Sequence, residues 1–318
     1  MTGYEELINN FISEPVNGIS ELAGGHINAS FLVDASEKYV LQRLNKNLYG
    51  GHLKELEHNY LQYSSACRES GNYVGKWYCP VWLRSRNGSF FHTDNAGNIW
   101  RVYRYMPSDP VPVMSSRDGA FGIGRSLGKL HRILGKCTDI KTIETTKHLH
   151  DLEYHYGKFR MQDSSKTERV EELDHIISSK IDSMLHITVP AGKTIHGDAK
   201  VSNMIFEDGE AVGFIDLDTI MTGSVFDDIA DCLRSCRAYE DGASEAEIIT
   251  WFNMGYEEGA GIVFSKDEAE LALQNVSRNR FVLGIRYYTD YLSSEGYFTE
   301  EYPGQSLEKA RRLLSMER

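Results

Sequence analysis

The chain has 318 residues, too many for one minimal domain, and its 41% hydrophobic residues can fill the cores of two lobes. Its formal charge of -12, from 46 acidic and 34 basic residues, disfavours a nucleic-acid partner because an acidic surface repels phosphate backbones. There is no signal-peptide pattern, no run of about 18 apolar residues and no regular cysteine spacing, so we expect a cytoplasmic protein that does not span a membrane.

The first third of the chain is rich in strand patterns. Residues 29–34 and 39–44 predict two strands joined by a polar turn. Apolar residues at helical spacing predict a helix over 53–70, and three further strands are predicted at 77–83, 89–93 and 99–105. This part therefore predicts a sheet with one intervening helix.

The pattern changes after Met106, where two nearby prolines predict a hinge. The rest is mainly helical, with helices predicted at 117–134, 149–160, 166–185 and from about 226 onward, including a long one at 268–293, and a β-rich island at 194–218. A β-rich lobe over 1–106 followed by a helical lobe over 107–318 is an α+β arrangement with a cleft between the lobes.

The strongest chemical pattern is HGDAKVSN at 196–203, followed by GFIDLD at 213–218. Phosphoryl transfer needs one carboxylate to accept the proton of the attacking hydroxyl, and hard oxygen ligands to hold Mg²⁺ against the phosphates. Asp198, in a loop after a predicted strand, suits the first role. Asn203 and Asp216, at the end of an apolar strand, suit the second, with Asp218 as a further candidate metal ligand.

Each part of this pattern also has a simpler explanation. His-Gly-Asp occurs by chance in turns, and aspartates at strand ends often cap loops. The combination is much more specific, because its spacing is that of the protein-kinase catalytic loop and metal-binding aspartate in a variant form. It predicts a kinase that uses ATP and Mg²⁺.

The sequence resembles the aminoglycoside phosphotransferase and choline kinase superfamily, which is related to protein kinases. Segments closer to the N-acetylhexosamine 1-kinases are GHIN at 25–28, YVLQRLN at 39–45, IDLDT at 215–219 and GIRYYTDYL at 284–292. The resemblance runs from about residue 22 to about residue 313. It implies a bilobal protein-kinase-like fold with a small β-rich lobe and a larger helical lobe.

The resemblance also assigns roles. It implies that Asp198 is the catalytic base and that Asn203 and Asp216 bind magnesium. Asp228 resembles the buried carboxylate that supports the catalytic loop together with His196, although a carboxylate at a helix N-terminus is also favoured by the helix dipole.

Candidates for nucleotide binding lie in the first lobe. Gly24 and Gly25 precede a strand and predict a tight turn over the phosphates, although two glycines alone indicate only a turn. Asn28 belongs to the same segment, which resembles the nucleotide lid of the family. Tyr105 lies in the hinge where we expect the adenine.

Arg43 stands at the strand position where protein kinases carry a phosphate-binding lysine. Strand alternation places it on one face with Leu41, as expected of a cleft residue. We expect Glu57, in preference to Glu55, to be its carboxylate partner. The simpler alternative is that all three charged residues are solvated.

Candidates for acceptor binding lie mainly on the predicted helix at 268–293. The resemblance implies that Arg286 binds sugar oxygens, and Tyr287 or Tyr288 is the candidate to flank an acetamido group. Alternatively, Arg286 pairs with Asp290 within the helix, and the tyrosine belongs to the core. His150 matches a His-Asp pair in similar sugar kinases, with its role left open.

Together these patterns predict that a monomer or weak dimer transfers the γ-phosphoryl group of ATP to the anomeric hydroxyl of an N-acetylhexosamine. Two alternatives remain open. One is a kinase for another hydroxyl compound, such as an aminoglycoside, choline, homoserine or another sugar; a cationic acceptor would need an acidic or aromatic cage. The other is a nucleotide-binding pseudokinase, against which the intact Asp198, Asn203 and Asp216 argue.

Overall fold

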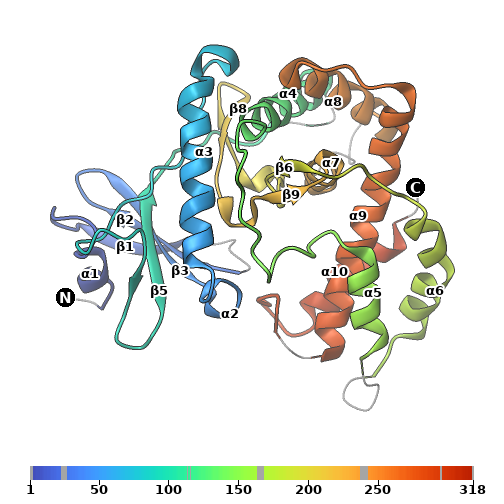
Figure 1. The fold of residues 1–318 in the computed structure, drawn as a ribbon. Helices are drawn as coiled ribbons and strands as arrows, with labels where there is room; N and C mark the ends of the chain where they lie inside the picture. Colours follow the sequence, from blue (N-terminus) through green and yellow to red (C-terminus); the bar gives the residue numbers. More distant parts are fainter. Residues whose placement is uncertain are drawn as a thin grey trace.

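The computed structural model describes residues 3–22, 27–112, 114, 116–162, 168–236, 243–293 and 296–316. A β-sheet lobe containing the N-terminus stands beside a larger helical lobe, with the long helix α3 (Leu53–Val74) between the sheet and the helices (Figure 1). The predicted α+β arrangement is therefore confirmed.

The sheet of the first lobe is antiparallel, with strand order β1-β2-β3-β5-β4. Its strands are β1 (Gly18–Leu22), β2 (Ala29–Asp34), β3 (Lys38–Leu44), β4 (His92–Thr93) and β5 (Ile99–Arg104). The register pairs Gln42 with Ser30 on one side and with Arg101 on the other. These three polar residues therefore form a row across one face, because directly paired residues share a face.

The opposite face of the sheet is apolar and is covered by the short helix α1 (Gly3–Ile8). Leu41 and Val102 are fully buried there in one cluster with Ile8. The sequence patterns did not predict α1, β1 or the short helix α2 (Lys46–Tyr49).

Two predicted strands are wrong in extent. Residues 77–83 form only isolated bridges, from Tyr78 to Gly213 and from Trp82 to Tyr103, because Pro80 has no N–H for a continuous ladder. The predicted strand at 89–93 is limited to His92–Thr93.

The second lobe contains α4 (Arg117–Leu134), α5 (Leu152–Arg160), α6 (Glu171–Leu185), α7 (Val225–Ser235), α8 (Glu245–Ala260), α9 (Lys266–Ser293) and α10 (Gln305–Ser315). Helix α5 begins later than predicted because the Asp151 side chain caps it, accepting a hydrogen bond from the Tyr154 amide. Two antiparallel strand pairs form the β-rich island, which extends slightly beyond the predicted 194–218. They are β6 (Lys193–Ile195) with β9 (Met221–Gly223), and the hairpin of β7 (Met204–Glu207) with β8 (Glu210–Phe214).

Helices α4 and α8 cross at close range through glycines. A Cβ atom at Gly124 would lie 2.0 Å from the Phe252 carbonyl oxygen, and one at Gly255 would lie 2.0 Å from the Phe121 carbonyl oxygen. The same holds one turn later at Gly259. Glycine is therefore required on both helices for this approach.

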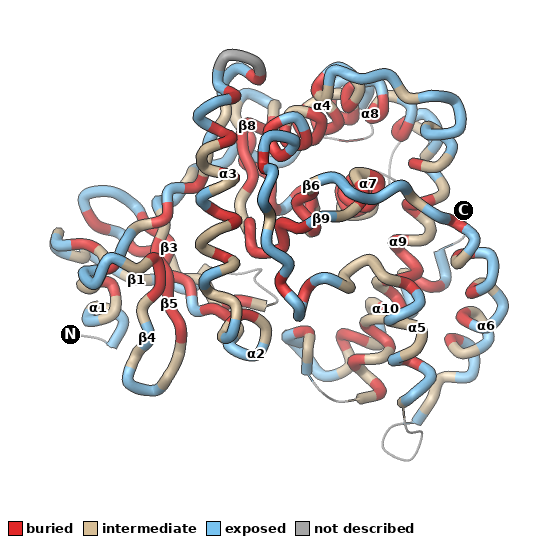
Figure 2. Tube along the Cα trace, in the orientation of Figure 1, coloured by how far each residue is buried: buried red, intermediate tan, exposed pale blue. Residues whose placement is uncertain are grey.

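One hydrophobic cluster extends through both lobes. It contains Leu44 and Ile99 from the sheet, Tyr63 from α3, and Leu127 and Phe252 from the α4–α8 pair. A second cluster joins α5, α6, α9 and α10. Buried segments line the interior of both lobes, whereas the loops between helices are largely exposed (Figure 2).

Candidate active site

A cleft of about 1070 Å³ opens between the lobes. The polar face of the sheet contributes Asn28, Gln42 and Arg101, and the segment after β5 contributes Tyr105 and Met106. The catalytic-loop sequence and parts of α7, α9 and α10 line the remainder. The residues singled out in the sequence are thus brought to one cleft, with the exceptions given below.

The loop after β6 is anchored on Asp228 of α7. The backbone amides of His196 and Gly197 donate to its carboxylate oxygens at 2.7 and 2.8 Å, and His131 Nε2 lies 2.8 Å from Oδ2. Burial favours the neutral acid, but the hydrogen bond and charge of His131 outweigh it, so the pKa of Asp228 lies below its ordinary value.

Gly197 is a point where only glycine fits. Its φ is +81°, and a Cβ atom there would lie 2.3 Å from the Thr219 carbonyl oxygen. This tight turn directs the next residue, Asp198, into the cleft.

Asp198 is held beside a lysine that the sequence analysis did not assign. Lys200 Nζ lies 2.5 Å from Asp198 Oδ2, and Asn203 Nδ2 donates to the same oxygen at 3.2 Å. Burial raises the pKa of Asp198, but the charge and hydrogen bond of Lys200 and the charge of Arg234 lower it to about 2. The carboxylate is therefore ionised at neutral pH, and no described residue donates a hydrogen bond to its Oδ1.

Asn203 and Asp216 lie on the same side of the cleft. The amide group of Asn203 also donates to the Asp198 carbonyl oxygen at 2.8 Å, which leaves Asn203 Oδ1 as the free acceptor. Asp216 adopts a left-handed backbone conformation, with φ 61° and ψ 55°. Among the described residues, none donates a hydrogen bond to its carboxylate, and burial together with the charge of Asp218 raises its pKa.

These two residues fit a magnesium ion. A carboxylate without a partner and a free amide oxygen are the hard oxygen donors that Mg²⁺ prefers, and the ion takes its other ligands from phosphates and water. In the described part of the chain there is no group of three or more His, Cys, Asp or Glu that could hold a metal alone. Binding would thus depend on the phosphates of a nucleotide.

Asp218 does not serve as a further metal ligand in this arrangement. Its side chain is fully buried, and both of its oxygens are occupied by Arg101, at 2.5 Å from Nη1 and 2.9 Å from Nη2. Asn28 Nδ2 lies 3.3 Å from Oδ2. This corrects the sequence-based expectation, because an aspartate neutralised by arginine has no oxygen left for a cation.

Arg101 of β5 is a buried cation in the nucleotide half of the cleft, which Arg104 also lines. It is 2% exposed, its Nε donates to Gln42 Oε1 at 2.9 Å, and its guanidinium lies 4.5 Å from the centre of the Trp82 ring. The sequence analysis missed it, since its partners lie on other strands and in the other lobe.

The predicted orientation of Arg43 toward the cleft is wrong. Arg43 shares a face with Leu41 as predicted, but that is the face covered by α1, and its exposed side chain lies over the Trp100 ring. The expected partner Glu57 is instead 3.4 Å from Arg84 Nη1. Neither residue lines the cleft.

The remaining nucleotide-side candidates divide into two groups. Asn28 is buried beside Asp218 and accepts a hydrogen bond from the Asn45 amide at 2.9 Å, and Tyr105 lines the cleft. Gly24 and Gly25 lie outside the described residues.

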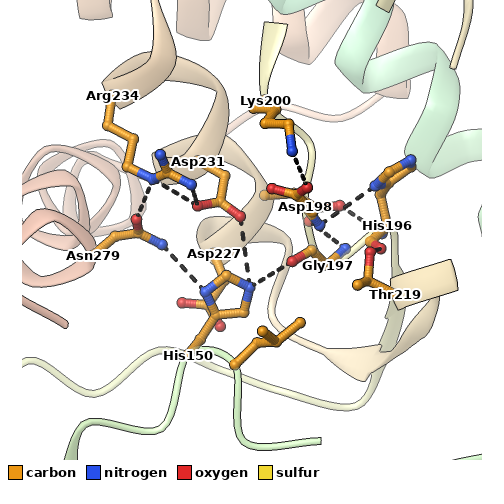
Figure 3. A network of polar contacts seen from close by, with 12 residues as sticks. His150, His196, Gly197, Asp198, Lys200, Thr219, Asp227, Asp231, Arg234 and Asn279 are labelled. Atoms are coloured by element: carbon orange, nitrogen blue, oxygen red, sulfur yellow. Dashed lines mark hydrogen bonds and ion pairs between the residues drawn. The ribbon is translucent and has the colours of Figure 1, made fainter. Parts of the chain in front are cut away.

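His150 lines the cleft and supports the catalytic loop through hydrogen bonds (Figure 3). Arg234 Nε donates to Asn279 Oδ1 at 2.8 Å, so the amide nitrogen of Asn279 faces His150 Nδ1 at 3.2 Å. His150 Nδ1 must then be the acceptor, and its protonated Nε2 donates to the Gly197 carbonyl oxygen at 3.0 Å. The chain Arg234–Asn279–His150–Gly197 thus fixes the loop that carries Asp198.

Arg286 and Tyr287 of α9 both line the cleft. Arg286 does not pair with Asp290 but donates to the Tyr297 hydroxyl at 3.3 Å and to the Leu149 carbonyl oxygen at 3.5 Å. Asp290 instead accepts the backbone amide of Tyr297 at 2.7 Å. The ring of Tyr287 packs on Phe298 with centroids 4.0 Å apart.

Within the described residues, no helix combines the length and hydrophobicity needed to cross a bilayer.

Solved structures of three kinases resemble the whole chain. Spectinomycin phosphotransferase APH(9)-Ia, in complex with ADP and spectinomycin, is 15% identical with a TM-score of 0.59, covering 98% of this chain and 93% of that chain. Amicoumacin kinase hAmiN, in complex with AMP-PNP, Ca²⁺ and Ami, is 16% identical with a TM-score of 0.63, covering 99% and 92%.

A choline/ethanolamine kinase family protein from Mesorhizobium loti is 13% identical with a TM-score of 0.60, covering 94% of this chain and 89% of that chain. Identities this low establish the fold, and they confirm the bilobal protein-kinase-like class. The sequence pattern of the phosphotransferase enzyme family matches residues 18–262, most of the chain, including the whole catalytic loop. The chain therefore belongs to the phosphotransferase enzyme family.

Proposed function

We propose that this protein transfers the γ-phosphoryl group of ATP to a hydroxyl of a small molecule, and that the acceptor is the anomeric hydroxyl of an N-acetylhexosamine. The observation that carries the proposal is the meeting of Asp198, Asn203 and Asp216 in one cleft. Nucleotides bound to similar folds, such as the ADP of the spectinomycin enzyme, support the use of ATP.

Asp198 is placed to orient the acceptor. Lys200 and Asn203 hold its Oδ2, so Oδ1 is the oxygen available to a substrate hydroxyl. A carboxylate with a pKa of about 2 is a weak base, so its main contribution is to align the hydroxyl for in-line attack. The proton moves to Asp198 as the bond to phosphorus forms.

Asn203 Oδ1 and the Asp216 carboxylate would hold the magnesium ion. When bound, the ion neutralises charge on the phosphate oxygens during transfer. Arg101 borders the same half of the cleft. Gln42 and Asp218 accept four of its five N–H groups, so we assign only the remaining N–H on Nη1 to the phosphate-facing role that Arg43 cannot fill. The hydrogen bonds from Arg101 to Gln42 and Asp218 fix the plane of the guanidinium, which reduces the entropy lost on binding.

The acceptor class rests on the helical end of the cleft. The packed rings of Tyr287 and Phe298 line the cleft and offer an apolar platform for one face of a sugar ring. Arg286 lies beside the same rings, 5.5 Å from the centre of Phe298. The segment at 284–292 that contains two of these residues is among those that resemble the N-acetylhexosamine 1-kinases.

The test is an ADP-release assay with Mg-ATP and a panel of N-acetylglucosamine, N-acetylgalactosamine, glucose, galactose, choline, homoserine and kanamycin. We expect turnover with the N-acetylated sugars and an acid-labile 1-phosphate product. Turnover only with another member of the panel would support the kinase activity but overturn the N-acetylhexosamine as the acceptor. Full turnover by the Asp198→Asn variant with the best acceptor would overturn the proposed mechanism itself.

A further inference from the structure

The acceptor half of the cleft is strongly basic in a chain whose net charge is -12. Six cationic side chains line it, namely Lys200, Arg234, Arg280, Arg286, Lys309 and Arg312. The carboxylates that line the cleft are Asp198, Asp216 and Asp231. The sign of this surface is therefore opposite to that of the protein as a whole.

Half of these cations are neutralised within the protein. Lys200 pairs with Asp198, Arg234 Nη2 lies 2.6 Å from Asp231, and Arg280 Nη2 lies 2.9 Å from Glu245. Such pairs contribute to the shape of the cleft, but little of their charge is left for a ligand.

The other three cations have no such acid among the described residues. Across the described ranges, no aspartate or glutamate forms an ion pair with Arg286, Lys309 or Arg312. The partners of Arg286 are uncharged: the Tyr297 hydroxyl, the Leu149 carbonyl oxygen and the rings of Tyr297 and Phe298. Lys309 lies over the Tyr287 ring. Glutamates at 300, 301 and 308 act on Lys309 only from a distance.

These charges converge on one point in front of the catalytic loop. Lys309 Nζ lies 5.3 Å from the centre of the Tyr287 ring, and Lys200, Arg234 and Arg286 are the cations whose charges act on the Tyr287 hydroxyl. They come from the catalytic loop, α7, α9 and α10, so distant parts of the chain contribute charge of one sign to one place.

Concentrating cations without acids in a partly buried cleft costs free energy, because like charges repel and desolvation disfavours them. A ligand anion offsets that cost, whereas a polycationic acceptor such as an aminoglycoside would increase it. An arginine fork and a lysine ammonium together form a site suited to a carboxylate or phosphate.

We infer that the acceptor carries a carboxylate or phosphate group in addition to the hydroxyl that is phosphorylated, and that Arg286 and Lys309 bind this group. The inference rests on the proposed kinase function and narrows its substrate class. Within the N-acetylhexosamines it selects acidic members, such as a 6-phosphate or a uronic acid. The acceptor oxygen bonds to the γ-phosphorus, the bond to the β–γ bridging oxygen breaks, ADP leaves, and the proton passes through Asp198 to solvent.

The experiment compares matched acceptors that differ in charge. N-acetylglucosamine, its 6-phosphate, N-acetylglucosaminuronic acid and glucosamine are assayed with Mg-ATP at low and high salt. A charge-assisted hydrogen bond is worth about 1.5–3 kcal/mol, so we expect kcat/KM for an acidic sugar to exceed that for the neutral sugar at least about tenfold. High salt should reduce this ratio. The two acids distinguish a carboxylate from a phosphate preference.

Two variants locate the effect. In Arg286→Gln and Lys309→Gln, KM for the acidic sugar should rise about tenfold, while KM for ATP changes little. In both variants the ratio of kcat/KM for the acidic sugar to that for the neutral sugar should fall. Arg311→Gln is the matched control, because Arg311 is exposed on α10 next to Arg312 and does not line the cleft. This control variant should keep the full preference for the acidic sugar over the neutral sugar.

The outcomes separate this inference from the proposed function. Equal or better use of the neutral sugar overturns the inference and leaves the kinase in place. If no sugar is turned over, calorimetry of the same acids with the ADP-bound protein decides. If the acidic sugars bind in a salt-sensitive way and this binding is lost in Lys309→Gln, the result supports an anion site. If they bind no more tightly than the neutral sugar, the inference is overturned.

Discussion

The cations in the two halves of the cleft have different partners. In the nucleotide half, Arg101 is buried and its charge is neutralised inside the protein by Asp218. In the acceptor half, Arg286 and Lys309 rest on aromatic rings, and no acid of the described chain pairs with them. A buried pair fixes geometry, whereas cations without acids are available to a ligand. The charges of the nucleotide half thus stabilise the fold, and those of the acceptor half are available to select the ligand.

The largest expected effect separates chemistry from nucleotide binding. Asp198→Asn removes the negative charge that aligns the acceptor hydroxyl, so kcat should fall roughly 10²–10⁴-fold, while affinity for ATP, bound in the other half, changes less than about threefold. Single-turnover kinetics and calorimetry with a non-hydrolysable ATP analogue measure the two quantities. A parallel loss of ATP affinity would show that the halves are not separable.

The next effect tests the stability side of the comparison. Asp218→Asn leaves Arg101 buried without its counter-charge, which should lower the free energy of unfolding by about 3–5 kcal/mol. Arg286→Gln, the acceptor-half counterpart, removes the hydrogen bonds to Tyr297 and Leu149 but leaves no buried charge unpaired, so it should lower the same free energy by only about 0.5–1.5 kcal/mol. Urea denaturation of both variants measures this contrast. Equal losses of unfolding free energy in the two variants would show that the two halves of the cleft do not differ in this respect.

The third effect is a pH dependence at His155 of α5, which does not line the cleft but is affected by the charge of Arg286. Burial, and secondarily the charge of Arg286, lower the pKa of His155 to about 3, against about 6.5 in an unfolded chain. Between these values the unfolded chain binds more protons. Stability should therefore fall as pH drops from about 6.5 toward 3, by up to roughly 1.4 kcal/mol per pH unit.

Thermal melts of wild type and His155→Gln across this range check the prediction. The variant should show a flatter dependence, because the neutral amide does not titrate. Identical slopes would assign the loss of stability to other groups.

The smallest expected effect tests which arginine of the first lobe contributes to ATP binding. Arg43 is exposed on the face of the sheet away from the cleft, so Arg43→Gln should leave KM for ATP within about twofold and stability within about 0.5 kcal/mol. Arg101→Gln should raise the same KM at least about tenfold. Steady-state kinetics measure both values. If KM for ATP rose more in Arg43→Gln than in Arg101→Gln, the phosphate-facing role of Arg101 would be refuted.

The catalytic loop could be predicted because its parts are close in sequence. Asp198, Asn203 and Asp216 span a single β-rich island, and a local turn at Gly197 is enough to direct the first of them into the cleft. The α+β order of the lobes followed from hydrophobic periodicity alone.

The charged partners could not be predicted because they depend on register and on covering elements. Strand alternation correctly grouped Arg43 with Leu41, but only the position of α1, which had no clear pattern, decides that this face is turned away from the cleft. Arg101 meets Gln42 through the β3–β5 pairing. Lys309 reaches the site only because α10 packs against α9 through the second cluster.

The hydrophobic cluster that continues from Leu44 in the sheet, through Tyr63 of α3, to Phe252 of α8 has a thermodynamic consequence. The lobes are separate in architecture but share one cooperative interior, so neither should melt alone as a complete unit. A nucleotide that binds only the folded cleft should then protect amide hydrogens in α8 from exchange. Helix α8 would report occupancy without touching the ligand.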